Sequence, residues 1–338
     1  MNLEEFLAEW HNESPYVQVQ TSGSTGAPKP MLVEKKRMLN SARITCDFLG
    51  LKKGDTALLC MSLDYIAGKM MVVRALERGL NLITVEASGH PLAPANFQLS
   101  TFRSSLARLQ GKNSQLSFAA MVPMQVYNSL LVAEERERLM QIRHLIIGGG
   151  AIDDGLAAEL KTFPNAVWST YGMTETLSHI ALRRLSGEDA SEWYTPFNSV
   201  KVSLSDEGCL VIDAPLVCAE RLVTNDMAEL LPDGRFRILG RKDNVICSGG
   251  IKIQAEEVEH ELHSHLNAPY LISKRKDAKF GEVVVLLTEG DTAEARRVCE
   301  QVLPKYHQPR AYVHVDRIPL TETGKPARRQ AEQLAMKG

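Results

Sequence analysis

The chain has 338 residues, of which 44% are hydrophobic and 24% are charged, and its formal net charge is −2. This length favours two domains, and the composition is typical of a folded globular protein and not of a disordered or fibrous one. A net charge near zero provides no global field that would recruit nucleic acid or an anionic membrane, so an anionic ligand needs a local site.

The cysteines and the hydropathy of the chain indicate where in the cell the protein is located. The six cysteines are scattered without a C-x-x-C pair, which is typical of reduced thiols in a cytoplasmic protein. The acidic N-terminal segment lacks the basic and apolar regions of a signal peptide, and no apolar run reaches 18 residues. We therefore expect a cytoplasmic protein with no membrane span and no nucleic-acid partner.

In chain order, short β-rich runs alternate with helical stretches from residue 16 to about 185. This alternation predicts an α/β fold in which helices flank a mostly parallel sheet. Helical apolar spacing covers 34–49 and 66–76. The expected strands are YVQVQ (16–20), TALLCM (56–61), LNLITV (80–85), LSFAAMV (116–122), HLIIGG (144–149) and AVWSTY (166–171).

The pattern changes in the second half of the chain. Short strands with turn signals between about 195 and 240 predict a small β-rich layer. After Gly240, helical spacing near 254–265 and 292–303 and strands near 283–288 and 311–315 predict a separate α+β domain. We place an N-terminal domain at 1–240 and a C-terminal domain at 241–338.

A loop after the first expected strand concentrates hydroxyls, glycines and a lysine. Glycines let backbone N–H groups turn toward an anion, while hydroxyls and an ammonium group add further donors. We interpret the loop as a polyphosphate cradle, although composition alone also allows a flexible Ser/Gly linker. It comprises Thr21, Ser22, Gly23, Ser24, Thr25, Gly26, Ala27, Pro28 and Lys29.

The string T-S-G-S-T-G-x-P-K resembles the signature loop of the acyl-adenylate-forming superfamily, which includes acyl-CoA ligases, luciferases and peptide-synthetase adenylation domains. Four more motifs follow in the order of that superfamily, so that the resemblance covers residues 16 to about 330. They are Gly148-Gly149-Gly150-Ala151, Tyr171-Gly172-Met173-Thr174-Glu175, Thr224-Asn225-Asp226 with Gly240-Arg241, and Thr323-Gly324-Lys325.

The resemblance implies an enzyme that uses ATP, Mg²⁺ and coenzyme A. A carboxylate attacks the α-phosphate, pyrophosphate leaves, and the CoA thiol then displaces AMP. In this scheme the C-terminal domain rotates between the two half-reactions. The implied roles are adenine binding by Gly149, Gly150, Ala151, Tyr171 and Gly172, α-phosphate contact by Thr174, Mg²⁺ binding by Glu175, ribose binding by Asp226 and Arg241, transition-state contact by Lys325, a hinge at Asp243, and a CoA path beside Ser248, Gly249 and Gly250.

Simpler interpretations of single motifs stay open. A glycine triplet is equally typical of a strand–helix turn, and the Gly249–Gly250 pair of a β-turn. An isolated aspartate is more often a loop residue or a helix cap. His260, His263 and His265 lack metal-ligand spacing, and we interpret them as a solvated helix face.

Within the superfamily, four strings resemble the o-succinylbenzoate:CoA ligase branch of menaquinone synthesis: TSGSTG-x-PK, YGMTETLSHIA, GRKDN-x-x-x-SGG-x-x-I-x-x-EEVE and KYHQPR. That branch implies a dicarboxylate, whose second carboxylate needs a cation or hydroxyls. The candidates are Arg74 and Ser178, with Tyr65 at the gate where many relatives have histidine. For Arg74 the alternative is a solvated charge beside Glu77 and Arg78.

Relatives carry a subdomain ahead of the phosphate loop, where this chain has 20 residues. We therefore expect a homodimer or a rearranged N-terminal segment to cover the sheet face that the subdomain would bury. Three other functions stay open: a ligase for another aryl or acyl acid, a ligase with a carrier-protein thiol as acceptor, and a non-catalytic nucleotide-binding protein.

Overall fold

The computed structural model describes residues 1–20, 30–97, 116–321 and 326–337. The chain divides into two compact units that interleave between residues 203 and 235. The first unit holds Met1–Val202, Ile212–Leu222 and Asp233–Arg235, and the second holds Ser203–Val211, Val223–Pro232 and Phe236–Gly338. A boundary between residues 240 and 241 stays a prediction.

The first unit is built on a seven-stranded sheet in the order β4-β3-β5-β6-β7-β8-β9. The strands from β4 to β7 pair in parallel, while β8 and β9 add antiparallel pairs at one edge. This confirms the mostly parallel sheet. Its strands are β3 (Thr56–Leu59), β4 (Asn81–Thr84), β5 (Phe118–Met121), β6 (His144–Ile147), β7 (Ala166–Gly172), β8 (His179–Arg184) and β9 (Thr195–Pro196).

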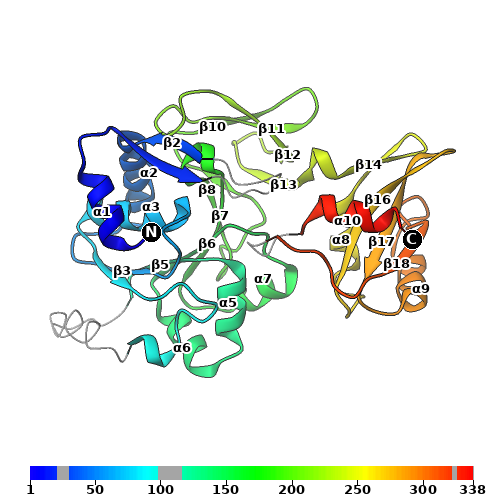
Figure 1. The fold of residues 1–338 in the computed structure, drawn as a ribbon, viewed down its shortest axis with the longest axis horizontal. Coiled ribbons are helices and arrows are strands. Elements are labelled where there is room, and N and C mark those ends of the chain that lie inside the picture. The colour runs from blue at the N-terminus through cyan, green and yellow to red at the C-terminus, as the bar shows by residue number, and fades with distance from the viewer. Residues whose placement is uncertain (21–29, 98–115, 322–325, 338) are drawn as a thin grey trace. The chain divides into compact units, whose positions relative to one another are not determined.

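Helices cover both faces of this sheet, with α2 and α3 on one side and α5, α6 and α7 on the other (Figure 1). The central strands β3 and β5 are therefore buried throughout, as continuous apolar runs predict. The helices are α2 (Lys35–Phe48), α3 (Ile66–Arg78), α5 (Pro123–Leu130), α6 (Ala133–Gln141) and α7 (Asp154–Lys161), with short 3₁₀ turns η1 (Pro94–Phe97) and η2 (Thr174–Thr176).

The N-terminal segment departs from the expected sheet. The run at 16–20 forms β1 (Tyr16–Gln20), which pairs antiparallel with β2 (Pro30–Glu34) in a sheet of its own. Its placement in the parallel sheet was wrong because YVQVQ buries alternate residues, Val17 and Val19, as a half-exposed hairpin does. A capped helix, α1 (Leu3–His11), precedes it and buries Phe6.

The predicted β-rich layer is a four-stranded sheet in the order β10-β11-β12-β13, in which β12 and β13 are antiparallel. Its strands are β10 (Lys201–Leu204), β11 (Cys209–Asp213), β12 (Leu222–Leu230) and β13 (Phe236–Arg241).

The rest of the second unit is the expected α+β fold, a sheet in the order β15-β14-β17-β16 with β18 parallel to β17. Both faces are covered, because alternate residues of β16 and β17 enter two cores: Ile272 and Val284 pack with α8 and α9, and Leu271 and Val285 pack with α10. The elements are η3 (Lys242–Asn244), β14 (Val245–Ser248), β15 (Ile251–Gln254), α8 (Ala255–Leu262), β16 (Tyr270–Asp277), β17 (Gly281–Thr288), α9 (Thr292–Val302), β18 (Ala311–His314) and α10 (Arg328–Ala335).

The described residues bear on the expected absence of a membrane span and on the interpretation of three histidines. No helix there is long and apolar enough to cross a membrane. His260, His263 and His265 are all exposed, as a solvated helix face predicts.

A half-buried histidine on β6 makes stability depend on pH. Burial, together with the charges of Arg143 and Arg184, lowers the pKa of His144 to about 4 from an ordinary value of 6.5. Between those values the unfolded chain binds a proton that the folded chain does not, so the free energy of unfolding falls as pH falls through this window. We expect His144→Gln to reduce that loss, measured by urea unfolding from pH 7 to about 4.

The exposed His265→Gln is the matched control and should keep the pH dependence of the wild type. Identical pH dependence in His144→Gln and the wild type would contradict the assignment.

Candidate nucleotide and acid site

The motif Tyr171–Glu175 forms the turn at the carboxyl end of β7. Tyr171 is half-buried and its ring lies 5.8 Å from that of Tyr194. Thr174 is 8% exposed, whereas Glu175 is exposed. In open α/β sheets this edge is where ligands bind, so the structure places the predicted adenine, phosphate and Mg²⁺ residues at a suitable edge.

The hydroxyl of Thr176, which the sequence analysis missed, holds this turn together. Its Oγ1 accepts from the Met173 amide at 3.1 Å and lies 2.8 Å from the Ser178 carbonyl, to which it donates. The side chain is fully buried. Thr176 therefore fixes the backbone on which Thr174 and Glu175 are presented.

Two backbone features direct the chain into β8. A Cβ on Gly172 would lie 2.3 Å from the carbonyl oxygen of Ser178 and 2.5 Å from Cα of His179. Leu177 has φ of +65°, the one positive φ of a non-glycine residue in the described part of the chain. A left-handed backbone at a non-glycine residue costs about 1–3 kcal/mol of stability, and it persists only where the surrounding structure holds it in place. Gly172 and Leu177 thus set the direction of Ser178.

The glycine motif directly follows the neighbouring strand. Gly148–Ala151 follows β6, which pairs in parallel with β7 through Ile147 and Ser169. A Cβ on Gly148 would lie 2.3 Å from Oγ1 of Thr170, and Gly149 has φ of +81°. Gly149, Gly150 and Ala151 are exposed at the same carboxyl edge as Tyr171. The turn between β6 and α7 therefore lies at the carboxyl edge of the sheet, where open α/β sheets bind ligands.

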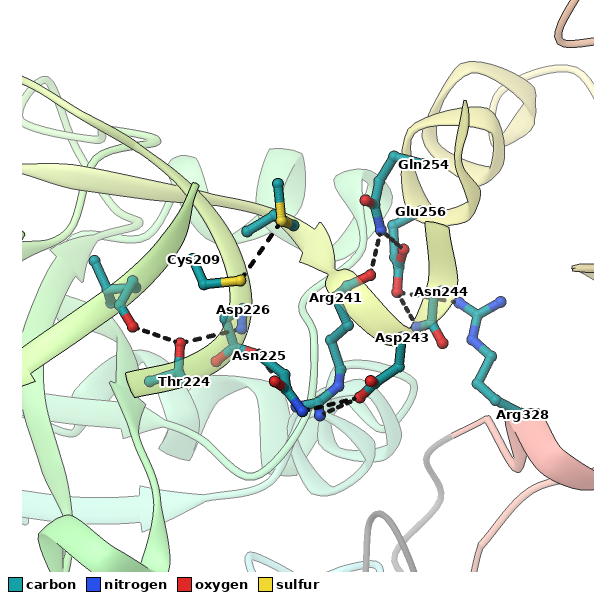
Figure 2. Close-up of polar contacts among 12 residues, drawn as sticks. Cys209, Thr224, Asn225, Asp226, Arg241, Asp243, Asn244, Gln254, Glu256 and Arg328 are labelled. Atoms are coloured by element: carbon teal, nitrogen blue, oxygen red, sulfur yellow. Dashed lines mark hydrogen bonds and ion pairs between the residues drawn. The ribbon is translucent and has the colours of Figure 1, made fainter. Parts of the chain in front are cut away.

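The predicted ribose pair lies in the second unit, across strands β12 and β13. Arg241 donates to Asp226 at 3.2 Å and to Asp243 at 2.9 Å, and Figure 2 shows these side chains pointing toward one another. The Thr224 hydroxyl fixes the backbone by donating to the Leu210 carbonyl at 2.8 Å and accepting from the Asp226 amide at 3.1 Å. The structure thus brings together residues 15 positions apart.

The two aspartates favour the charged form of Arg241. Burial disfavours the charged form of Arg241, but the hydrogen bond with Asp243 and the charge of Asp226 outweigh it, so the pKa of Arg241 is raised. The Asp226 side chain is 17% exposed. An ionised carboxylate only accepts hydrogen bonds, which is the chemistry that the predicted ribose role of Asp226 requires.

Downstream, the glycine pair is a hairpin turn. Gly249 and Gly250 have φ of +58° and +88° and join β14 to β15, which fits a two-residue turn with positive φ at both positions. Ser248 ends β14, and the Gly249 amide donates to the Phe280 carbonyl at 2.8 Å. The β-turn is therefore present, while the hinge and CoA-path roles of Asp243 and 248–250 stay predictions.

The predicted acid residues Arg74 and Ser178 contact each other. Arg74 lies on α3 and is only 2% exposed, and its NH2 group donates to Ser178 Oγ at 2.6 Å. Interpreting Arg74 as a solvated charge was therefore wrong, because eight consecutive α3 residues, 68–75, are buried. Tyr65 is 36% exposed and directly precedes α3.

Arg74 has no acidic counter-ion in the described part of the chain. Its other contact among these residues is Met71 Sδ at 3.8 Å, and its Nε is buried without a partner among them. Burial lowers the pKa of Arg74 to about 10. A buried cation of this kind is costly unless an anion pairs with it, so the site has the chemistry of a carboxylate receptor.

Two predicted groups lie outside the described residues: the phosphate loop Thr21–Lys29 and the lysine Lys325. The residues that flank them are described. Gln20 pairs with Pro30 across the β1–β2 hairpin, and Leu320 bridges Pro326.

The chain matches the AMP-binding enzyme family over residues 4–220 and therefore belongs to that family. A solved acyl-CoA synthetase (AMP-forming)/AMP-acid ligase II-like protein from Dyadobacter fermentans is 30% identical, with a TM-score of 0.63 over 96% of this chain and 91% of that one.

Two curated relatives are longer than this chain. The 2-succinylbenzoate–CoA ligase of Haemophilus influenzae is 24% identical over 88% of this chain and 66% of its own length. Surfactin synthase subunit 2 of Bacillus subtilis is 25% identical over 90% of this chain and 9% of its own length. The chain thus spans less than two thirds of each of these two proteins.

The close approach at Gly172 generates a prediction. In Gly172→Ala the new methyl group would collide with the backbone of Ser178 and His179, which cannot rotate away. We expect a loss of about 1–3 kcal/mol in the free energy of unfolding, typical of overpacking, measured by urea denaturation.

Gly155→Ala is the control, because Gly155 lies in helix α7, where the nearest atom to a Cβ is a carboxylate oxygen of Asp153 at 3.1 Å. Because that oxygen belongs to a side chain that can shift, we expect a smaller loss of stability in Gly155→Ala than in Gly172→Ala. Equal stability of the two variants would show that the turn is not tightly packed.

Proposed function

We propose that this chain is an ATP-dependent acid–thiol ligase that forms an acyl-adenylate and then an acyl-CoA thioester. The observation that carries the proposal is the buried Arg74 bound to Ser178, three residues beyond Glu175. Within one unit, a carboxylate receptor thus follows directly on the motif assigned to the nucleotide phosphates. Membership of the AMP-binding enzyme family supports the same chemistry.

The motif residues suit ATP and Mg²⁺. Tyr171 offers a ring face to adenine, and Asp226 with Arg241 offers acceptors and donors to the ribose. Glu175 is an exposed carboxylate at the ligand edge, which fits Mg²⁺, since this ion takes one or two carboxylates and completes its shell with phosphate oxygens and water. Bound there, Mg²⁺ would neutralise charge on the departing pyrophosphate. Lys325 would stabilise the charge that develops at the α-phosphate.

The favoured acid is o-succinylbenzoate. A dicarboxylate leaves one carboxylate free while the other reacts, and a buried guanidinium is a strong partner for it. The similarity to a 2-succinylbenzoate–CoA ligase supports this assignment. The product would then be o-succinylbenzoyl-CoA, an intermediate of menaquinone biosynthesis.

The runner-up is a ligase for another aryl or acyl acid, or one that uses a carrier-protein thiol. The similarity to surfactin synthase subunit 2, which is not named a CoA ligase, favours keeping this alternative. ATP–pyrophosphate exchange across a panel of acids, followed by detection of the thioester with CoA, separates these activities. A protein that binds ATP but supports no exchange with any acid would instead be the non-catalytic nucleotide binder.

The setting of the reaction is also a proposal. All six cysteines are free thiols, which is compatible with the reducing cytoplasm. A homodimer stays a prediction, and light scattering of the purified protein tests it.

Lys325→Ala tests the catalytic assignment. Loss of the ammonium group removes stabilisation realised in the transition state, so we expect pyrophosphate exchange to fall by about 10²- to 10³-fold while ATP affinity stays nearly unchanged. Lys276→Ala, which removes an exposed lysine outside the named motifs, is the control and should retain activity. If the two variants were equally active, Lys325 would have no catalytic role.

Arg74→Met tests the acid receptor. Removing a charge-assisted hydrogen bond of about 1.5–3 kcal/mol should raise KM for the dicarboxylate by about 10- to 150-fold, with KM for ATP unchanged. The same change removes an unpaired buried charge, so the free energy of unfolding should stay equal or rise. Steady-state kinetics and urea denaturation measure the two effects.

Arg43→Met is the matched control, because the Arg43 side chain is 55% exposed and pairs with Glu77 on the surface. It should leave both KM values unchanged. A destabilised Arg74→Met variant with an unchanged KM for the acid would show that Arg74 has a structural role only.

A further inference from the structure

Arg74 and Ser178 are the first two members of a longer hydrogen-bonded chain. Ser178 Oγ lies 3.2 Å from Nδ1 of His179, and the other ring nitrogen, Nε2, lies 3.0 Å from Oγ1 of Thr45. Thr45 in turn donates to the Ser41 carbonyl at 3.1 Å within helix α2. The chain thus runs from α3 through the start of β8 to α2, all within the first unit.

The inner members of this chain are sealed from water. Thr45 is 0% exposed and His179 is 7% exposed. The His179 ring also packs against Phe197, with ring centroids 5.6 Å apart. Burial, with the nearby charge of Arg74 as a second cause, holds the pKa of His179 well below its ordinary value. His179 is therefore a neutral imidazole with a single ring proton.

The position of that proton follows from counting donors. The Thr45 hydroxyl gives its one proton to Ser41, so Oγ1 faces His179 with a lone pair. Nε2 must then carry the ring proton, and Nδ1 is a bare acceptor. Only the Ser178 hydroxyl can donate to Nδ1, and Ser178 Oγ in turn accepts from Arg74.

The opposite tautomer satisfies fewer groups. If Nδ1 carried the proton, Thr45 would have to turn its hydroxyl from Ser41 to Nε2. Ser178 Oγ would then accept from both His179 and Arg74, and its own proton would have no acceptor among the described residues. The first arrangement gives both hydroxyls and both ring nitrogens a partner, so it is favoured over one that leaves the Ser178 donor unmatched.

We infer that the chain has a single direction, and that Ser178 is a positioning residue for Arg74 and not a donor to the acid. The Ser178 proton is committed to His179, so the free N–H groups of Arg74, including the unpartnered Nε, are left to receive the substrate carboxylate. His179 and Thr45 act on Arg74 only through Ser178, because they fix the orientation of the Ser178 lone pair that accepts from Arg74. The substrate part of this inference rests on the proposed function, whereas the direction of the chain does not.

The tautomer is tested directly by long-range ¹H–¹⁵N NMR of the whole chain labelled in its histidines, with His179 assigned from the signals lost in His179→Gln. We expect a neutral ring protonated at Nε2 and bare at Nδ1. A ring protonated at Nδ1 overturns the inference. The result does not depend on any substrate, so it stands even if no acid proves to be activated.

The consequence for recognition is tested with Thr45→Val, which keeps the side-chain shape but removes the acceptor for Nε2, and with Thr45→Ser, which restores it. Loss of one buried hydrogen bond should raise KM for the dicarboxylate by about two- to tenfold in Thr45→Val, with kcat and KM for ATP unchanged. Thr45→Ser should return KM for the acid toward the wild-type value. Equal KM for the acid in all three proteins would overturn the positioning role.

A double-mutant cycle decides between positioning and direct donation by Ser178. If Ser178 acts through Arg74, Ser178→Ala raises KM for the acid in the wild type but has no effect in the Arg74→Met background. If Ser178 donates to the acid itself, the effect of Ser178→Ala persists in that background, and the inference is wrong. Well-dispersed amide spectra establish that each variant is folded.

Discussion

A guanidinium group buried without a carboxylate partner in the described part of the chain is the constraint on which the site in the first unit depends. Arg74 is 2% exposed, and its one strong contact is Ser178 Oγ at 2.6 Å. Burying a cation costs several kcal/mol unless its interaction with an anion offsets the loss of hydration. A fold selected for stability alone would place methionine or leucine at this position. The position is explained if the missing anion belongs to the substrate.

The backbone between β7 and β8 orients Ser178 for its contact with Arg74. Ser178 has to face α3, and the chain reaches this orientation through a glycine at 172 that allows the two strands to approach and a leucine at 177 in a left-handed conformation. The same turn presents Thr174 and Glu175 at the carboxyl edge of the sheet. Strain at Leu177 and a close approach at Gly172 thus link the motif predicted to bind the nucleotide to the proposed acid receptor within one unit.

The sequence predicted the features that local pattern encodes. Continuous apolar runs identified β3 and β5, and the Gly249–Gly250 pair allowed the β-turn that joins β14 to β15. It could not decide whether Arg74 was solvated, because burial of α3 on several sides arises from tertiary packing. Thr45 and His179 were missed for the same reason: they lie 134 positions apart, and no motif marks their contact.

The most direct test of the substrate assignment is calorimetric titration of the wild-type protein with o-succinylbenzoate and with an analogue whose non-reacting carboxylate is replaced by an amide of the same shape. If Arg74 receives that carboxylate, the analogue binds at least about tenfold more weakly, because a charge-assisted hydrogen bond contributes about 1.5–3 kcal/mol. Equal affinity for the two compounds would contradict a receptor built around Arg74.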